Sequence, residues 1–267
     1  MPIAFACNGK APTLSGWTRG LRLLGVGLHL VRGAAILALL FPLMSAARRR
    51  AAIAQWSSTF LAILAVRLDV AGAPPQSDGR PVMVVANHVS WVDILAINAI
   101  LPVRFVAKAE VRKWPFIGWM CKRAGTLFIE RAYRRDTVRL NELLVETMRG
   151  GDAIAIFPEA TTTDGSGLLQ FHSSLMQPAV VTGAAVWPVA IRFQRMDGTL
   201  CWEAAYTGGT SVWDTLKLMA TQREIRAQLF FLQPIDTCDA HRRVVAVRAR
   251  QAILRALFPP APNNRTG

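Results

Sequence analysis

The sequence predicts an α/β fold: a largely parallel sheet flanked by helices and preceded by an N-terminal membrane-associated helical hairpin. Short apolar runs rich in Val and Ile alternate with longer segments of helical period. Several of these runs stop abruptly at polar side chains, as strands do at the carboxyl edge of an open α/β sheet. Two long apolar segments with arginines around them come before the first such run.

The composition indicates a protein that works at a membrane. Of the 267 residues, 52% are hydrophobic and 18% are charged, and the net charge is +14. Such a chain is drawn to anionic lipid headgroups and to acidic partners. Nucleic acid would suit the charge, but the sequence has no recognition module, and we expect no nucleic-acid partner. The four cysteines lie far apart without metal-ligand spacing, so we expect reduced thiols and no metal site.

Residues 1–72 form the predicted membrane-associated region. The run 21–44 is mostly apolar, but its uninterrupted part is short for a membrane span, which needs about twenty residues. A second apolar segment, 51–70, has a polar side, and three arginines at 48–50 separate the two. Arg32 and Arg67 would be costly at the bilayer centre, so an interfacial hairpin is favoured over a crossing helix. A helix pair buried on the domain is the other alternative.

A linker rich in Pro and Gly at 73–79 opens the second region, predicted to be one catalytic domain over 73–258 with a disordered tail at 259–267. Apolar period distinguishes its strands from its helices. In chain order we expect strands at 83–86, 104–108, 125–131, 153–157, 186–193, 200–206 and 225–232, and helices at 94–101, 136–148 and 239–258, with a turn that opens a further helix at 113–119.

The chemistry is predicted at the end of the first strand of this domain, in the segment Asn-His-Val-Ser-Trp-Val-Asp at 87–93. Ser90 as a helix N-cap would place Asp93 in the first helical turn, within reach of the His88 imidazole. An imidazole with a carboxylate on one nitrogen is a better base at the other, suited to taking a proton from a hydroxyl. Alternatively, Ser90 and Asp93 form only a capping pair.

The order of four segments resembles the glycerolipid acyltransferases, the family of the bacterial 1-acylglycerol-3-phosphate acyltransferases. Residues 87–93 resemble its His-x-x-x-x-Asp motif and residues 108–131 its second block. Phe-Pro-Glu-Ala-Thr-Thr at 157–162 resembles the third block and Val-Trp-Pro-Val-Ala at 186–190 the fourth. This ordered spacing is specific to the superfamily and says little about the substrate.

The resemblance implies O-acyl transfer from acyl-CoA or acyl carrier protein to a lysolipid hydroxyl at an anionic membrane surface, with no cofactor. His88 would be the general base and Asp93 its orienting partner, with backbone amides near residues 159–162 as donors to the oxyanion. Taken alone, Arg131 would be an ion-pair partner and Glu159 a helix cap. Carried onto this chain, the substrate-binding residues would be Lys108, Arg131, Glu159, Thr161 and Thr162.

Two departures from the family pattern bear on the acceptor. Ala160 stands where the family usually has Gly, and Thr162 where it usually has Arg, so one guanidinium suited to phosphate is missing. We expect 1-acyl-sn-glycerol-3-phosphate as acceptor, which would give phosphatidic acid for phospholipid biosynthesis at the cytoplasmic face of the inner membrane. A phosphate-free lysolipid such as lyso-ornithine lipid is the alternative.

Two other function classes compete with a transferase. A lipid esterase would need a nucleophile, and the chain has no Gly-x-Ser-x-Gly motif. In a non-enzymatic lipid-binding protein the His-Asp pair would be idle. The basic C-terminal helix at 239–258 suits anionic lipid or an acidic acyl carrier protein, or is an ordinary solvated face.

Overall fold

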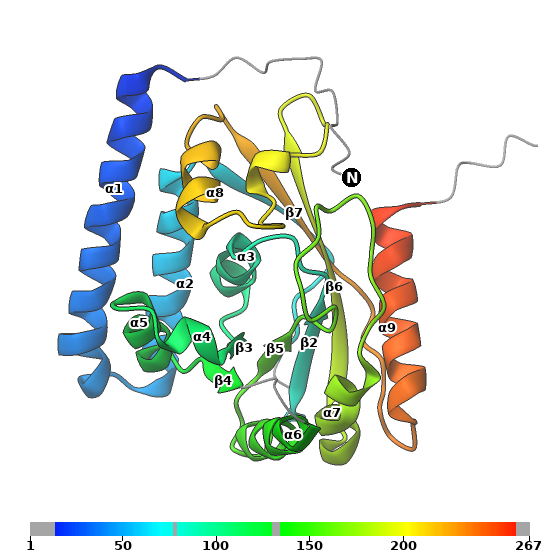
Figure 1. The fold of residues 1–267 in the computed structure, drawn as a ribbon. Coiled ribbons are helices and arrows are strands. Elements are labelled where there is room, and N and C mark those ends of the chain that lie inside the picture. Colours follow the sequence, from blue (N-terminus) through cyan, green and yellow to red (C-terminus); the bar gives the residue numbers. More distant parts are fainter. Residues whose placement is uncertain (1–13, 77–78, 130–133, 260–267) are drawn as a thin grey trace, which may run out of the picture.

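The computed structural model describes residues 14–76, 79–129 and 134–259. Their strands form one seven-stranded sheet, made of β1 (Val66–Ala71), β2 (Val82–Ala86), β3 (Arg104–Lys108), β4 (Leu127–Ile129), β5 (Ile154–Ile156), β6 (Ala185–Arg195) and β7 (Ile225–Phe231). The strand order is β1-β7-β6-β2-β5-β3-β4. Only β6 and β7 pair in antiparallel fashion within this sheet, so the predicted largely parallel sheet is confirmed (Figure 1).

Helices pack against both faces of the sheet (Figure 1). Strand β2 shows why: Val84 and Ala86 join one apolar cluster while Met83 and Val85 join another, because side chains alternate along a strand. The helices are α1 (Gly16–Ala35), α2 (Ala46–Ile63), α3 (Val92–Ile100), α4 (Ala109–Arg112), α5 (Ile117–Arg123), α6 (Arg134–Arg149), α7 (Gln177–Thr182), α8 (Val212–Met219) and α9 (Arg242–Leu257). The first cluster includes residues of α2, α3 and α8, and the second includes residues of α6, α7 and α9.

The N-terminal helices form the expected hairpin. Helix α1 continues through a π turn and a 3-10 turn to Leu43, and Ser45 caps the start of α2 by accepting from the Arg48 amide. The helical run Gly16–Leu43 has 28 residues and contains an 18-residue window with a mean hydropathy of 2.0, so it is long and apolar enough to cross a membrane by length and composition. Its outward face exposes large apolar side chains, namely Trp17, Leu21, Leu24, Leu28, Val31, Leu39, Leu40 and Leu43.

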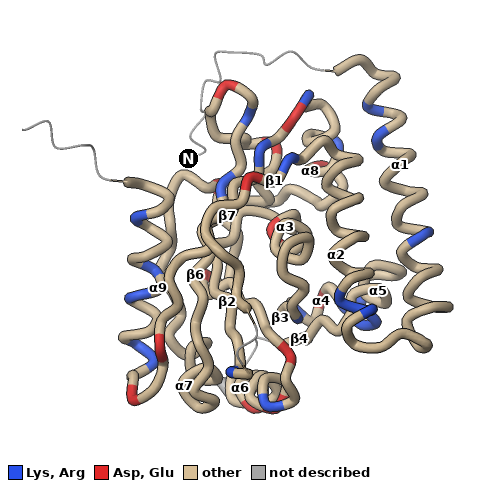
Figure 2. Tube along the Cα trace, turned by 180° about the vertical axis from the view of Figure 1, so that it is seen from behind, with Lys and Arg blue, Asp and Glu red and all other residues tan. Residues whose placement is uncertain are grey.

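Helix α9 lies on the other side of the sheet from α1 (Figures 1 and 2). Its apolar face is buried in the second cluster, and Arg250 donates to the carbonyls of Leu168 and Leu169. The apolar side of α9 therefore packs into the core. The opposite side of the helix exposes Arg243, Arg248 and Arg255 to solvent.

Two predicted elements are wrong. The second apolar segment does not remain helical to residue 70: α2 ends at Ile63, and Val66–Ala71 is edge strand β1, parallel to β7. Residues 200–206 are not a strand but contain a 3-10 turn at Trp202–Ala204. There the chain leaves the sheet after pairing Cys201 N with the Phe193 carbonyl.

Candidate active site

The site lies where β2 ends and α3 begins, in residues 87–93, which we name the histidine loop. His88 Nδ1 is 2.7 Å from Asp93 Oδ2, so the structure brings the two predicted residues together. The same carboxylate oxygen accepts from the amides of Val89 at 2.7 Å and Ser90 at 2.9 Å. The Asp93 side chain is fully buried, and these three donors fix both the ring and the loop around it.

The predicted N-cap at Ser90 is wrong. Trp91 occupies the N-cap position of α3, and the Ser90 hydroxyl makes no hydrogen bond within the described residues. The carboxylate of Asp93 satisfies the loop amides instead, from inside the first turn. The capping interaction and the imidazole contact thus belong to one side chain, and they are not alternatives.

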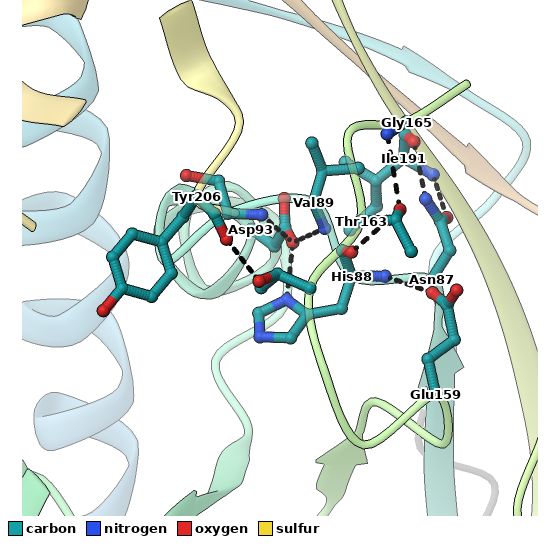
Figure 3. A network of polar contacts seen from close by, with 11 residues as sticks. Asn87, His88, Val89, Asp93, Glu159, Thr163, Gly165, Ile191 and Tyr206 are labelled. Carbon is teal, nitrogen blue, oxygen red and sulfur yellow. Dashed lines mark hydrogen bonds and ion pairs between the residues drawn. The ribbon is translucent and has the colours of Figure 1, made fainter. Parts of the chain in front are cut away.

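The imidazole is left with one functional nitrogen. Because Nδ1–H donates to Asp93, Nε2 is the unprotonated nitrogen and can accept a proton. The His88 side chain is 19% exposed, so the imidazole is not sealed from solvent. Figure 3 shows one edge of the ring against Asp93 and the opposite edge turned away from it.

A second segment, residues 157–165, which we name the glutamate loop, follows β5 and encloses His88 from the other side. The Phe157 ring stacks on the imidazole, with centroids 3.9 Å apart and planes 7° from parallel. The His88 amide donates to Glu159 Oε1 at 2.8 Å, and the Thr163 amide donates to the His88 carbonyl at 2.8 Å. The glutamate loop therefore holds the main chain of His88 through Glu159 and Thr163, as Figure 3 shows, and its Phe157 ring positions the imidazole.

Glu159 is buried and has both oxygens engaged. Besides the His88 amide, it accepts from the Leu169 amide at 2.8 Å through Oε2, and its exposed fraction is 3%. Burial raises the pKa of this carboxyl, and the two backbone donors oppose that rise. The predicted substrate-binding residue thus connects two backbone segments, and its carboxylate is covered rather than presented to solvent.

Thr161 and Thr162 lie farther along the glutamate loop. The Thr162 hydroxyl donates to the Tyr206 carbonyl, and the Tyr206 amide donates to the Val89 carbonyl at 2.9 Å. Thr161 is exposed. Within the described part of the chain, the backbone amides of Thr161 and Thr162 donate to no protein acceptor.

Ala160, between Glu159 and Thr161, has a φ of 59°, in the left-handed region that favours glycine. The family pattern has Gly at this position, and the structure keeps the glycine-type backbone although the residue is alanine. The motif therefore retains its turn at the cost of local strain.

The two remaining predicted residues are placed differently. Lys108 ends β3 and is exposed at the N-cap position of α4, on the same carboxyl edge of the sheet as His88. Arg131 lies outside the described residues. In the described ranges, no three His, Cys, Asp or Glu side chains come together in a group that could hold a metal.

Two positioning residues were not predicted from the sequence. The Asn87 side chain donates to the Ile191 carbonyl at 2.9 Å and accepts from the Ile191 amide at 2.7 Å, which continues the β2–β6 pairing one residue past the strand. An asparagine directly after a buried strand is the signal that could have found it. No sequence signal could have found Tyr206, because it contacts Thr162 and Val89 through its backbone carbonyl and amide only.

Comparisons with known proteins show to which family the chain belongs. The family model described as Acyltransferase matches residues 67–192, which include both loops. The lyso-ornithine lipid O-acyltransferase of Pseudomonas aeruginosa is 38% identical over 211 residues, 79% of this chain and 80% of that protein. The 1-acyl-sn-glycerol-3-phosphate acyltransferase of Neisseria gonorrhoeae is 44% identical over 146 residues, 55% of this chain and 56% of that protein.

Among solved structures, the 1-acyl-sn-glycerophosphate (LPA) acyltransferase PlsC from Thermotoga maritima has the same fold. The TM-score is 0.66 at 22% identity, over 90% of this chain and 96% of that chain. The fold and the similarity to relatives, one of them matched over 80% of its length, agree. The chain therefore belongs to the acyltransferase family and is an enzyme that acylates lysolipids.

Proposed function

We propose that His88 is the general base of a direct acyl transfer. The observation that carries this is the 2.7 Å contact of His88 Nδ1 with Asp93, which leaves Nε2 to accept a proton. The lysolipid hydroxyl gives its proton to Nε2 while its oxygen attacks the thioester carbonyl of the acyl donor. The tetrahedral intermediate then expels the thiolate, which takes the proton back from the imidazolium. No acyl-enzyme and no cofactor are needed.

The oxyanion of that intermediate requires hydrogen-bond donors. We assign this role to the backbone amides of Thr161 and Thr162, which have no protein acceptor within the described residues and belong to the loop that encloses His88. The amides of Val89 and Ser90 are not suited, because Asp93 already accepts from both.

The acceptor proposed is a phosphate-free lysolipid of the lyso-ornithine type. Thr162 stands where the family pattern has arginine, and its hydroxyl donates to the Tyr206 carbonyl. This position therefore has no guanidinium that could bind the phosphate of an acceptor. The Pseudomonas aeruginosa relative, which this chain matches over 80% of that protein's length, is a lyso-ornithine lipid O-acyltransferase. A second relative of this name, from Rhodobacter capsulatus, is 33% identical over 71% of its length.

The second candidate acceptor is 1-acyl-sn-glycerol-3-phosphate. It is favoured by the higher identity, 44%, to the Neisseria gonorrhoeae enzyme over 55% of the chain. Lys108 at the same sheet edge, together with Arg131, would then supply the charges for the phosphate. The donor for either acceptor is acyl-CoA or acyl carrier protein, and the proposed place of work is the cytoplasmic face of the inner membrane.

An acceptor panel tests the proposal. Purified enzyme is given one acyl-CoA and either lyso-ornithine lipid or lysophosphatidic acid, and released thiol and acylated product are both measured. We expect at least a tenfold higher rate on lyso-ornithine lipid, and no thiol release without acceptor. A tenfold preference for lysophosphatidic acid would establish the second candidate instead. Thiol release without acceptor would indicate an esterase.

The variant His88→Ala tests the catalytic assignment in the same assay. Loss of a general base lowers the rate by about 10²–10⁴-fold. Binding of the lysolipid, measured separately, should remain, because the ring is replaced without a change in the surrounding loops. Turnover at the wild-type rate would remove His88 from the mechanism.

A further inference from the structure

Residues 113–119, which comprise the connection from α4 to α5 and the first residues of α5, expose three large aromatic side chains. We name this segment the aromatic turn. Trp114 is 40% exposed, Phe116 44% and Trp119 37%. Three aromatic rings held at the surface within six residues need an explanation, because soluble surfaces seldom gather such groups unless they bind something.

The backbone of the aromatic turn is strained. Phe116 has φ 64° and ψ −62°, and the Ile117 amide donates to the Pro115 carbonyl at 2.7 Å, which together make a γ-turn centred on an aromatic residue. Next to it, a side chain on Gly118 would begin 2.5 Å from the Arg112 carbonyl oxygen. In this conformation the Phe116 ring is 44% exposed rather than packed into the protein, and such local strain often accompanies functional segments.

The aromatic turn is continuous with the apolar face of the hairpin. Met120 of α5 is buried in one cluster with Leu37 and Phe41, at the end of the long helical run. Figure 1 shows α4 and α5 beside the ends of α1 and α2 where these helices join. At that same end, Leu39 and Leu43 are among the most exposed apolar side chains of the chain. The two exposed apolar surfaces therefore adjoin.

The surroundings of the aromatic turn are basic. Arg112, Lys113, Lys122 and Arg123 are all exposed, whereas Glu110 is the one exposed acid of α4, the turn and α5. The Arg123 guanidinium lies over the Trp119 ring, 5.9 Å from its centroid. Tryptophan rings beside cationic side chains are typical of the layer in which lipid headgroups meet the acyl chains.

We propose that the aromatic turn is a second membrane-contacting element, which inserts Trp114, Phe116 and Trp119 into the headgroup layer of an anionic bilayer next to α1. The occupant of this surface is a lipid bilayer. Since α4 follows β3 directly at Lys108, the aromatic turn also keeps the carboxyl edge of the sheet, where His88 lies, next to that bilayer.

Vesicle partitioning of the full-length protein tests this proposal without use of turnover, so the result does not depend on the acceptor. Wild type, Trp114→Ser/Trp119→Ser and the control Val247→Ser/Phe258→Ser are sedimented with phosphatidylglycerol vesicles and with phosphatidylcholine vesicles. The control residues are similarly exposed but belong to the α9 side of the sheet. We expect the tryptophan variant to bind phosphatidylglycerol vesicles at least tenfold more weakly, and the control to bind within twofold of wild type.

Phe116→Gly separates membrane contact from folding. Glycine adopts the φ of 64° without strain, so this variant should melt at the wild-type temperature or above while its partitioning falls severalfold. Wild-type partitioning of both turn variants would overturn the proposal. A change in oligomeric state without vesicles, with vesicle binding intact, would also overturn it and would assign the surface to self-association.

Discussion

The histidine loop and the glutamate loop follow neighbouring parallel strands, β2 and β5, and meet at His88, yet different forces hold them. Within the histidine loop the central contacts are local, since Asp93 accepts from three groups that precede it by five, four and three residues. The glutamate loop depends on distant partners, since Glu159 reaches the His88 amide 71 residues away and Thr162 reaches the Tyr206 carbonyl 44 residues away.

This difference indicates how such an enzyme can keep its chemistry while its acceptor changes. The His88–Asp93 pair itself forms within one short segment, and the glutamate loop adds further contacts to His88. The glutamate loop is held by several separate contacts, so single positions in it can depart from the family pattern, as Ala160 and Thr162 do. The following predictions test that contrast.

Asp93→Asn should have the largest effect. The amide group cannot accept from all three donors and carries no charge to stabilise the imidazolium, so kcat should fall by about 10²-fold or more. Unsatisfied buried N–H groups should also lower the free energy of unfolding by about 1–3 kcal/mol. Steady-state kinetics and urea denaturation measure the two effects. An unchanged kcat would show that His88 is not oriented by this carboxylate.

Glu159→Gln should have an intermediate effect. One of the two backbone amides loses its acceptor, at a cost of about 1–3 kcal/mol of stability, and His88 loses one of its supports, so kcat should fall about tenfold. Because burial raises the pKa of Glu159, the folded state binds its proton more tightly than the unfolded state does. The stability of wild type relative to this variant should therefore decrease as the pH rises through that pKa.

A pH series of urea denaturation curves for wild type and Glu159→Gln checks the sign. If the advantage of wild type grew with rising pH instead, the two backbone hydrogen bonds would outweigh desolvation, and the carboxylate would be a net stabilising charge. In both cases the difference in the free energy of unfolding gives the contribution of the Glu159 carboxyl group to the contact between the glutamate loop and His88.

Thr162→Val should have a smaller effect, because it removes only the hydroxyl that donates to Tyr206. One hydrogen bond contributes about 1 kcal/mol, so KM for the lysolipid should rise about fivefold with kcat nearly unchanged. Thr162→Ser keeps the hydroxyl and is the matched control. Equal KM values for both variants would mean that this contact does not position the acceptor.

Ala160→Gly should have the smallest effect, and a favourable one. Glycine removes the strain of the left-handed conformation at φ 59°, but it loses more backbone entropy on folding than alanine does. The first effect is the larger, so the variant should be more stable by about 0.5–1 kcal/mol. Activity should not change, because the backbone of the turn is already that of glycine. Thermal denaturation measures the gain, and a loss of stability would show that the methyl group makes contacts worth more than the strain.

Much of the fold could be predicted from the sequence, because buried strands and amphipathic helices have distinct periods. Strands β2, β3, β5 and β7 and helices α6 and α9 lie where the pattern places them. Strand β1 could not be predicted, since edge residues are half exposed and Val66 pairs with Ile225, far along the chain. The segment 200–206 has the composition of a strand, but tertiary contacts turn it away from the sheet.

The sequence by itself determined the alternation of strands and helices, the two strand ends at residues 87 and 157, and the His88–Asp93 pair, because each depends on residues close together in the chain. Only the tertiary structure decided that Glu159 is covered by two backbone amides, that Thr162 is joined to Tyr206 and that the aromatic turn adjoins α1. These contacts join segments tens of residues apart, and local propensity and periodicity contain no information about such distances.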